Sequence, residues 1–237
     1  ALFIGDEDAM RRFIFLFLVG GLGLLALLSL GIWQMQRLAW KEDILATIEA
    51  RIADAPGPLP EVLESERDKY LPVRLEGEIL PGELHVLTSI QGTGAGYRVS
   101  APFVTDGGRR LLLDRGFIIA SRKDETRTTG LATVIGNLHW PVEVDGFTPE
   151  PDTEKNIWYA RDVAPMAAEL GTEPAMVILR ELRSDAVDVG ATLPQPVTIS
   201  GIANDHLQYA LTWFSLAFIW AAMTAYFLWR NRAKSEG

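Results

Sequence analysis

The chain has no cysteine among its 237 residues. It therefore forms no disulfide bonds and offers no thiolate metal ligand, no thiol redox chemistry and no cysteine nucleophile. Its five methionines are scattered, which disfavours copper delivery by a methionine-rich cluster. Only three histidines are present, so each imidazole can be weighed individually.

Charged residues are missing from two long stretches near the two ends of the sequence. Phe13–Leu30 contains 18 residues and Leu207–Trp229 contains 23, all uncharged. An apolar helix of about 20 residues spans the hydrocarbon core of a bilayer and satisfies its own backbone there. We therefore predict two transmembrane helices, at residues 13–33 and 206–229, with residues 56–205 forming a domain outside the membrane.

The positive charges predict the orientation of these helices. Five cations flank the outer ends of the two runs: Arg11, Arg12, Arg230, Arg232 and Lys234. Because positive flanks stay in the cytoplasm, residues 1–12 and 230–237 are expected inside and the central domain outside. Arg37 and Lys41 lie on the opposite side of the first run but are fewer.

The alternative for the first run is a cleaved signal peptide, with small residues near Ser29 and Gly31 at the cleavage site. Secretory core regions have about 7–15 apolar residues, fewer than this run has. Apolar residues also keep helical spacing beyond Gly31, which favours a retained helix that continues to about residue 55. Pro56 and Pro58 then end it.

The segment between the two runs is acidic, with 17 basic and 27 acidic side chains in residues 34–206. An acidic domain is a poor partner for nucleic acid, whose binding rewards basic surfaces. Its size lies in the range of a single domain with its own core. We therefore expect the lipid bilayer as a partner, contacted through the two helices, and no nucleic acid.

The central segment has the pattern of short strands separated by turns. Asp106-Gly107-Gly108 predicts a hairpin turn, and Asp162 and Gly171 are expected to cap and end a short helix at 163–170. The expected strands cover residues 73–78, 84–88, 97–104, 110–120, 131–140, 176–182 and 197–203. The predicted fold class is a membrane protein of α+β type, with two transmembrane helices flanking a mainly antiparallel β extracytoplasmic domain, a sheet or small barrel, with short helices.

Other motifs in the central segment favour structural roles. The glycine-rich stretch 92–96 lacks the lysine and the strand-to-helix context of a phosphate loop, and we interpret it as a mobile hairpin. Asp114 and Arg115 are adjacent on a strand and point to opposite faces, so pairing with neighbouring strands is expected. His85 and His139 have no evident catalytic partner. We predict that the protein is not an enzyme and has no catalytic residue.

His206 differs from the other histidines because it begins the second apolar helix. Helical spacing places it on one face with Tyr209, Trp213, Ala217, Trp220 and Ala221. An ionisable residue at the mouth of a membrane span is a functional candidate, and imidazole is a common ligand of metals and haem. Aromatic and small residues below it predict a flat apolar slot for a lipid-soluble macrocycle with its iron level with His206.

A structural alternative remains open for these residues. His206 can simply begin the helix, and the Tyr and Trp residues can form the interfacial aromatic belt. On the first helix, Trp33, Gln34 and Arg37 lie at the same membrane depth, on the outer side. Arg37 can pair with a ligand carboxylate or can be an ordinary cation at a helix end.

Two strings at the membrane edge are specific enough to identify a family. Residues 30–41, LGIWQMQRLAWK, and residues 204–214, NDHLQYALTWF, resemble the two helix signatures of the surfeit locus protein 1 family of cytochrome c oxidase assembly factors. Between them, GYRV at 96–99, DRGF at 114–117 and WYARD at 158–162 fall in the expected order. Asp205 stands where this family is expected to have Asn.

The resemblance implies a non-enzymatic role in maturing the haem–copper oxidase. It implies haem a as a transiently bound cofactor, with His206 as the axial iron ligand. Together with the histidine-aromatic face of the second helix, it leads to the hypothesis that Trp33, Tyr209 and Trp213 flank the macrocycle and that Arg37 pairs with a propionate. The implied partners are the catalytic subunit of cytochrome c oxidase and the haem a synthesis enzyme. The implied location is the bacterial inner membrane, with the central domain in the periplasm, or the equivalent mitochondrial inner membrane.

Two other hypotheses compete with haem carriage. A haem-free membrane scaffold that stabilises an oxidase assembly intermediate would need the same helices. An outer-face enzyme would need an exposed cluster of titratable groups, and the sequence shows no such cluster.

Overall fold

The computed structural model describes residues 4–235 and the side chains of residues 10–230. The chain divides into two compact units. One contains the described residues up to 46 and those from 200 onward, and the other contains residues 47–199.

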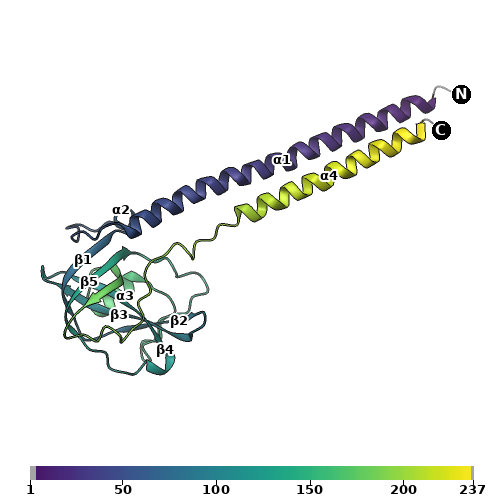
Figure 1. The fold of residues 1–237 in the computed structure, drawn as a ribbon. Coiled ribbons are helices and arrows are strands. Elements are labelled where there is room, and N and C mark those ends of the chain that lie inside the picture. The colour runs from purple at the N-terminus through teal and green to yellow at the C-terminus, as the bar shows by residue number, and fades with distance from the viewer. Residues whose placement is uncertain (1–3, 236–237) are drawn as a thin grey trace. The chain divides into compact units, whose positions relative to one another are not determined.

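The unit of residues 47–199 is built around a six-stranded sheet, labelled in Figure 1. The strands are β1 (Pro72–Ile79), β2 (Leu84–Ile90), β3 (Gly94–Thr105), β4 (Arg110–Ile119), β5 (Gly130–His139) and β6 (Met176–Arg183). Their order is β1-β5-β6-β4-β3-β2, and all pairs are antiparallel except the parallel pair β4–β6. The mainly antiparallel domain predicted from the sequence is thus confirmed.

The sheet closes on itself because β1 pairs with two partners. Residues 77–79 of β1 pair with β5 on one side and with β3 on the other. The strands β1, β5, β6, β4 and β3 therefore form a small barrel, and β2 extends it as an additional strand beside β3. Closure removes most exposed edges, where unpaired backbone groups would otherwise invite aggregation.

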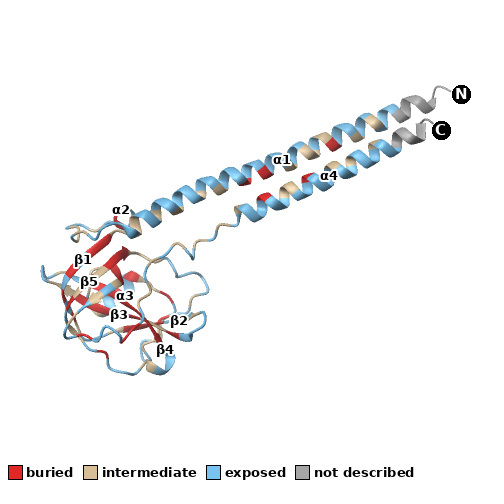
Figure 2. Ribbon diagram, viewed as in Figure 1, coloured by how far each residue is buried: buried red, intermediate tan, exposed pale blue. Residues whose placement is uncertain are grey.

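Two apolar cores lie on the two faces of the central strands. Leu111 and Leu113 of β4 belong to one cluster with Phe103, whereas Leu112 belongs to a second cluster with Met166 of α3 (Val163–Leu170). Because side chains alternate between the faces of a strand, β4 is buried on both sides. This explains the continuous apolar run Leu111–Leu113, and Figure 2 shows the buried residues concentrated in these strands.

Short helical segments complete this unit: α2 (Ser65–Asp68), η1 (Ala120–Arg122) and α3. Helix α3 has the predicted bounds, and Gly171 ends it with a left-handed backbone, φ 61°. Asp162 occupies the N-cap position but its side chain makes no capping hydrogen bond, contrary to the prediction. The hairpin turn at Asp106-Gly107-Gly108 is present between β3 and β4.

Two sequence predictions for the strands need correction. Residues 197–203 form no strand; Leu193 makes an isolated bridge to Phe117, and beyond it Val197 packs against the α3 cluster. Its apolar character therefore reflects core packing and not strand pairing. The glycine-rich stretch 92–96 does form a hairpin turn, but its last three residues belong to β3.

The other unit is a pair of long helices, α1 (Ile4–Ala53) and α4 (His206–Ser235). Helix α1 ends two residues before the end expected from the sequence, and its last residues, 47–53, belong to the barrel unit. There, the carbonyl of Ile52 accepts hydrogen bonds from Asn137 Nδ2 and Arg180 Nη1, both at 3.1 Å. These contacts tie the end of α1 to β5 and β6.

Among the described residues, two segments are long and apolar enough to cross a membrane: Met10–Ala53 and His206–Arg230. Only 6 % of the most apolar window of each is buried in the protein. Large side chains such as Phe15 and Phe218 are exposed, and Figure 2 shows both helices mainly as exposed surface. Such surfaces require an apolar solvent, in agreement with the predicted transmembrane helices.

Candidate functional site

His206 is the first residue of α4, and a side chain of α1 holds its ring. The backbone carbonyl of Asp205 accepts a hydrogen bond from the Tyr209 N–H at 3.1 Å, so Asp205 is the N-cap residue, for which Asp is favoured. The Nδ1 atom of His206 lies 2.8 Å from Oε1 of Gln34. Gln34 is only 8 % exposed, so its amide group has a fixed position.

This hydrogen bond determines which ring nitrogen is available. When the Gln34 carbonyl oxygen accepts the bond, the proton of the neutral imidazole lies on Nδ1. The Nε2 atom then carries the lone pair that binds a metal, and no described residue forms a hydrogen bond with it. A protein acceptor on the second nitrogen is the usual arrangement of a metal-binding histidine.

Arg37 lies between two indole rings of its own helix. Its guanidinium carbon is 5.6 Å from the ring centre of Trp33 and 5.1 Å from that of Trp40, at spacings of four and three residues. Within the described part of the chain Arg37 forms no ion pair, and its side chain is exposed. The two rings therefore orient a cation that is still able to bind a carboxylate.

The remaining predicted site residues lie on α4. Tyr209 is 56 % exposed and Trp213 is partly buried. Among the described residues, no ring–ring or cation–ring contact joins either of them to Trp33 or Arg37. The structure thus connects His206 to α1 through Gln34 and groups Trp33 with Arg37, but leaves Tyr209 and Trp213 as separate aromatic surfaces.

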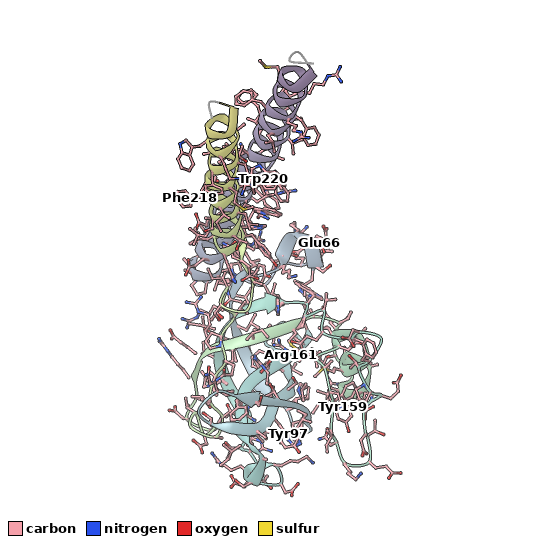
Figure 3. All side chains as sticks on the ribbon, turned by 90° about the vertical axis from the view of Figure 1, so that its right-hand side faces the viewer. Glu66, Tyr97, Tyr159, Arg161, Phe218 and Trp220 are labelled. Atoms are coloured by element: carbon pink, nitrogen blue, oxygen red, sulfur yellow. The ribbon has the colours of Figure 1, made fainter. Side chains whose placement is uncertain are left out.

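Farther along α4, the contact with α1 fills part of the predicted slot. The Trp220 Nε1 atom donates a hydrogen bond to the Gly20 carbonyl at 2.9 Å, and Ala217 is buried. Figure 3 shows Trp220 toward α1 and Phe218 away from it. Trp220 thus contacts α1, as expected where a helical face with small residues meets a second helix, but 37 % of its surface stays exposed, and the open apolar slot stays a prediction.

Glycines of α1 permit this close packing. A Cβ atom on Gly23 would lie 2.6 Å from the Trp220 ring, and one on Gly31 would lie 2.5 Å from Phe214. Because partners nearer the end of α4 lie nearer the start of α1, the two helices are antiparallel (Figure 1). The sequence placed Gln34 at the membrane depth of His206 but gave it no role, and these glycines were not assigned to the site; a polar amide opposite a histidine was a usable signal.

The histidines of the barrel unit have structural environments. His85 is buried, and its Nε2 atom lies 2.8 Å from Glu83 Oε1. His139 stacks on Tyr70 at 5.4 Å between ring centres. Burial, together with the nearby charges of Arg161 and Lys69, lowers the pKa of His139 to about 4, so the ring is neutral at pH 7.

Asp114 and Arg115 have separate environments, as predicted from their positions on one strand. The buried Asp114 carboxylate accepts a hydrogen bond from Arg98 Nε on β3 at 2.8 Å, and Arg161 Nη1 lies 3.5 Å away. Figure 3 labels Arg161 within the barrel unit. The predicted pairing with a neighbouring strand is therefore confirmed for Asp114 but wrong for Arg115, whose Nη2 atom donates to the carbonyl of Thr128 in the loop before β5.

The fold and the helix pair define a membrane protein whose β-barrel domain lies, in sequence, between two apolar helices. A family model described as "SURF1 family" matches residues 22–218. Surfeit locus protein 1 of Gallus gallus is 33% identical, with 81% of this chain and 69% of that protein covered. Surfeit locus protein 1 of Rattus norvegicus is 29% identical, over 95% and 77% respectively. A SURF1-like protein of Rickettsia felis is 28% identical, over 88% and 94%. The chain belongs to the SURF1 family.

Proposed function

We propose that this protein assists the assembly of a haem–copper cytochrome c oxidase by holding haem a for insertion into the catalytic subunit. The observation that carries the proposal is the hydrogen bond between His206 Nδ1 and the buried Gln34 side chain. It directs the lone pair of Nε2 away from α1 and makes His206 a suitable axial ligand. The assembly role itself comes from the resemblance to oxidase assembly factors.

The residues near the start of α4 suit the chemistry of this cargo. Haem a brings an iron with axial positions, two propionates and a long isoprenoid tail that partitions into lipid. His206 would bind the iron, and the exposed rings of Trp33 and Tyr209, with the partly buried ring of Trp213, would flank the macrocycle. Arg37 would pair with a propionate, since its guanidinium is exposed and held between two indoles.

A carrier must also release its cargo. A single protein imidazole is easier to displace than two, so one-sided ligation by His206 suits transfer better than permanent binding. The role is therefore non-enzymatic: the protein would bind, orient and hand over haem a without changing it. The haem a synthesis enzyme would be the donor and the catalytic subunit of the oxidase the acceptor.

The same proposal places the protein in the bacterial inner membrane, with both termini cytoplasmic and the barrel domain in the periplasm. Arg11 and Arg12 precede the apolar part of α1, and Arg230 follows that of α4. Because the helices are antiparallel, these cations come to the same end of the pair. The His206 end of the pair would then lie at the periplasmic surface.

The test is pigment binding by the full chain. The protein is co-expressed with a haem a synthesis pathway, purified in detergent and analysed by its absorption spectrum and extracted haem. Wild type is expected to carry haem a and His206→Ala to lose most of it. His139→Gln removes a barrel imidazole instead and should retain the pigment.

Equal haem a content in wild type and His206→Ala would refute the ligand assignment. A stable complex with the oxidase subunit that survives His206→Ala, and that forms in cells without haem a, would support the haem-free scaffold instead. Co-purification of the subunit from both strains distinguishes these outcomes.

A further inference from the structure

The barrel unit contains a pocket whose polar groups are not used by the helix-pair site. Its volume is about 550 Å³, within the usual range for small-molecule sites. It is lined by the β1–β2 turn, the loop of residues 123–129 and side chains that include His85, Ala101 and Arg115. The pocket therefore lies at one end of the barrel and reaches the strands β3 and β4.

Arg115 is the unusual residue of this pocket because its buried charge forms no ion pair with a described residue, although Glu83 and Asp188 act on it electrostatically. It is only 1 % exposed. Among the described residues it makes one hydrogen bond, from Nη2 to the Thr128 carbonyl at 3.3 Å, and its buried Nε atom has no partner. Burial lowers the pKa of Arg115, although a guanidinium stays charged at neutral pH. An unpaired buried charge of this kind is costly.

Four carboxylates lie near Arg115. Glu125 lines the pocket and pairs with Arg122, and Asp124 lines it as an exposed residue of the same loop. Glu83 forms an ion pair with the buried Arg127 and lies 2.8 Å from His85 Nε2. Burial opposes ionisation of Glu83, but the bonds to His85 and Arg127 outweigh it and lower its pKa to about 2. Asp188 also acts on Arg115 electrostatically, but it is exposed and its Oδ1 atom accepts the backbone N–H of Gly190.

The pocket thus holds two buried guanidinium groups, and Glu83 pairs with only one of them. On the rim, Lys123 and Thr126 come from the loop that covers the pocket. Neighbouring Nε and Nη groups of an arginine match the two oxygens of a planar oxyanion.

We propose that this pocket binds a small oxyanion, a carboxylate or phosphate group, on the Nε edge of Arg115. The ligand would neutralise the buried charge and satisfy the unpaired nitrogen. This inference is independent of haem binding, since every lining residue belongs to the barrel unit.

Equilibrium dialysis of the full chain in detergent tests the site. Radiolabelled succinate and radiolabelled inorganic phosphate are the probes, with chloride added to keep the ionic strength constant. Saturable binding of at least one probe is expected, and comparison of the two shows which oxyanion the site accepts. Arg115→Gln should weaken binding at least about 10-fold, the range of a charge-assisted hydrogen bond.

Two further variants keep the test decisive. Thr126→Trp places a large ring at the exposed rim and should block entry even if Arg115→Gln fails to fold. Arg183→Gln removes an exposed arginine of β6 that pairs with Glu181, and should bind as wild type does. The proposal is overturned if neither probe binds saturably, or if Thr126→Trp and every folded Arg115 variant bind as wild type does.

Discussion

The Nδ1 atom of His206 lies 2.8 Å from Oε1 of Gln34, which joins the first residue of α4 to a buried position of α1. The bond fixes both the tautomer and the direction of the imidazole. Gln34 is therefore a positioning residue for any ligand bound by His206.

Replacing Gln34 with Leu should weaken the proposed haem binding while the proposed ligand His206 is kept. Loss of a second-shell partner typically costs a metal site about 10–100-fold in affinity. The measurement is a haem titration of purified protein, followed by the position and height of the main absorption band. Gln36→Leu is the matched control because Gln36 is exposed on the same helix. Equal affinities in the two variants would contradict the positioning role.

Replacing Gly23 with Leu should loosen the helix pair. A Cβ atom there would lie 2.6 Å from Trp220, whereas a Cβ atom on Gly21 has no heavy atom within 4 Å. We expect Gly23→Leu to destabilise the pair by about 1–3 kcal/mol, the usual cost of overpacking. The apparent melting temperature of the full chain in detergent should fall for Gly23→Leu and stay unchanged for Gly21→Leu. The same melting temperature in both variants would argue against this contact.

His139 should make the protein less stable in mild acid. Its pKa is lowered from 6.5 to about 4 in the folded state. Between these values the unfolded chain binds a proton that the folded chain does not, so stability falls as the pH drops from about 6.5 to about 4. The loss is on the order of 1–3 kcal/mol. Melting curves between pH 4.5 and 7.5 should show it.

His139→Phe is the variant for this test because a phenyl ring can keep the stacking on Tyr70. Its stability should change less than that of wild type across the same pH range. Parallel pH curves for both proteins would show that another group dominates.

Asp114→Asn should be among the most damaging substitutions in the barrel. Its side chain is fully buried, and Arg98 and Arg161 would both lose their shared carboxylate. Removing one partner of a buried ion pair typically costs about 3–5 kcal/mol. Glu181→Gln removes an exposed partner of Arg183 and should cost much less. The stabilities of the two variants are compared by urea denaturation, followed by tryptophan fluorescence. Similar urea midpoints for both variants would contradict the importance of the ion pairs of Asp114 with Arg98 and Arg161.

Local signals accounted for much of the fold. The bounds of α3 followed from the apolar segment before Gly171, and the β3–β4 hairpin from Asp106-Gly107-Gly108. Barrel closure depends on the pairing of residues 77–79 with β3. This contact joins segments that are distant in sequence, and the residue pattern of neither segment predicts it. The strand predicted at residues 197–203 is absent because the apolar residue Val197 packs on the α3 cluster instead of pairing in the sheet. An apolar pattern alone does not distinguish these two roles.

The candidate site was likewise predictable where a local sequence signal exists, and not where it depends on contacts between distant segments. His206 was found because an ionisable residue at the edge of an apolar run is conspicuous. Its partner Gln34 and the packing of Trp220 on Gly20 and Gly23 depend on the register between two helices, which neither helix specifies alone. The sequence correctly paired Asp114 with a neighbouring strand. It could not predict that Nε of Arg115 lacks a hydrogen-bond partner, because this depends on how the loop of residues 123–129 folds around Arg115.

The position of β6 between β4 and β5 has a consequence for biosynthesis. Until Met176–Arg183 has emerged from the ribosome, β4 and β5 each have an unpaired side, and the ring stays open. A chain terminated before Met176 would expose the unpaired edges of β4 and β5 and would be prone to aggregation and proteolysis. The last strand of the barrel is thus made shortly before α4, so completion of the ring and insertion of the second helix fall close together in time.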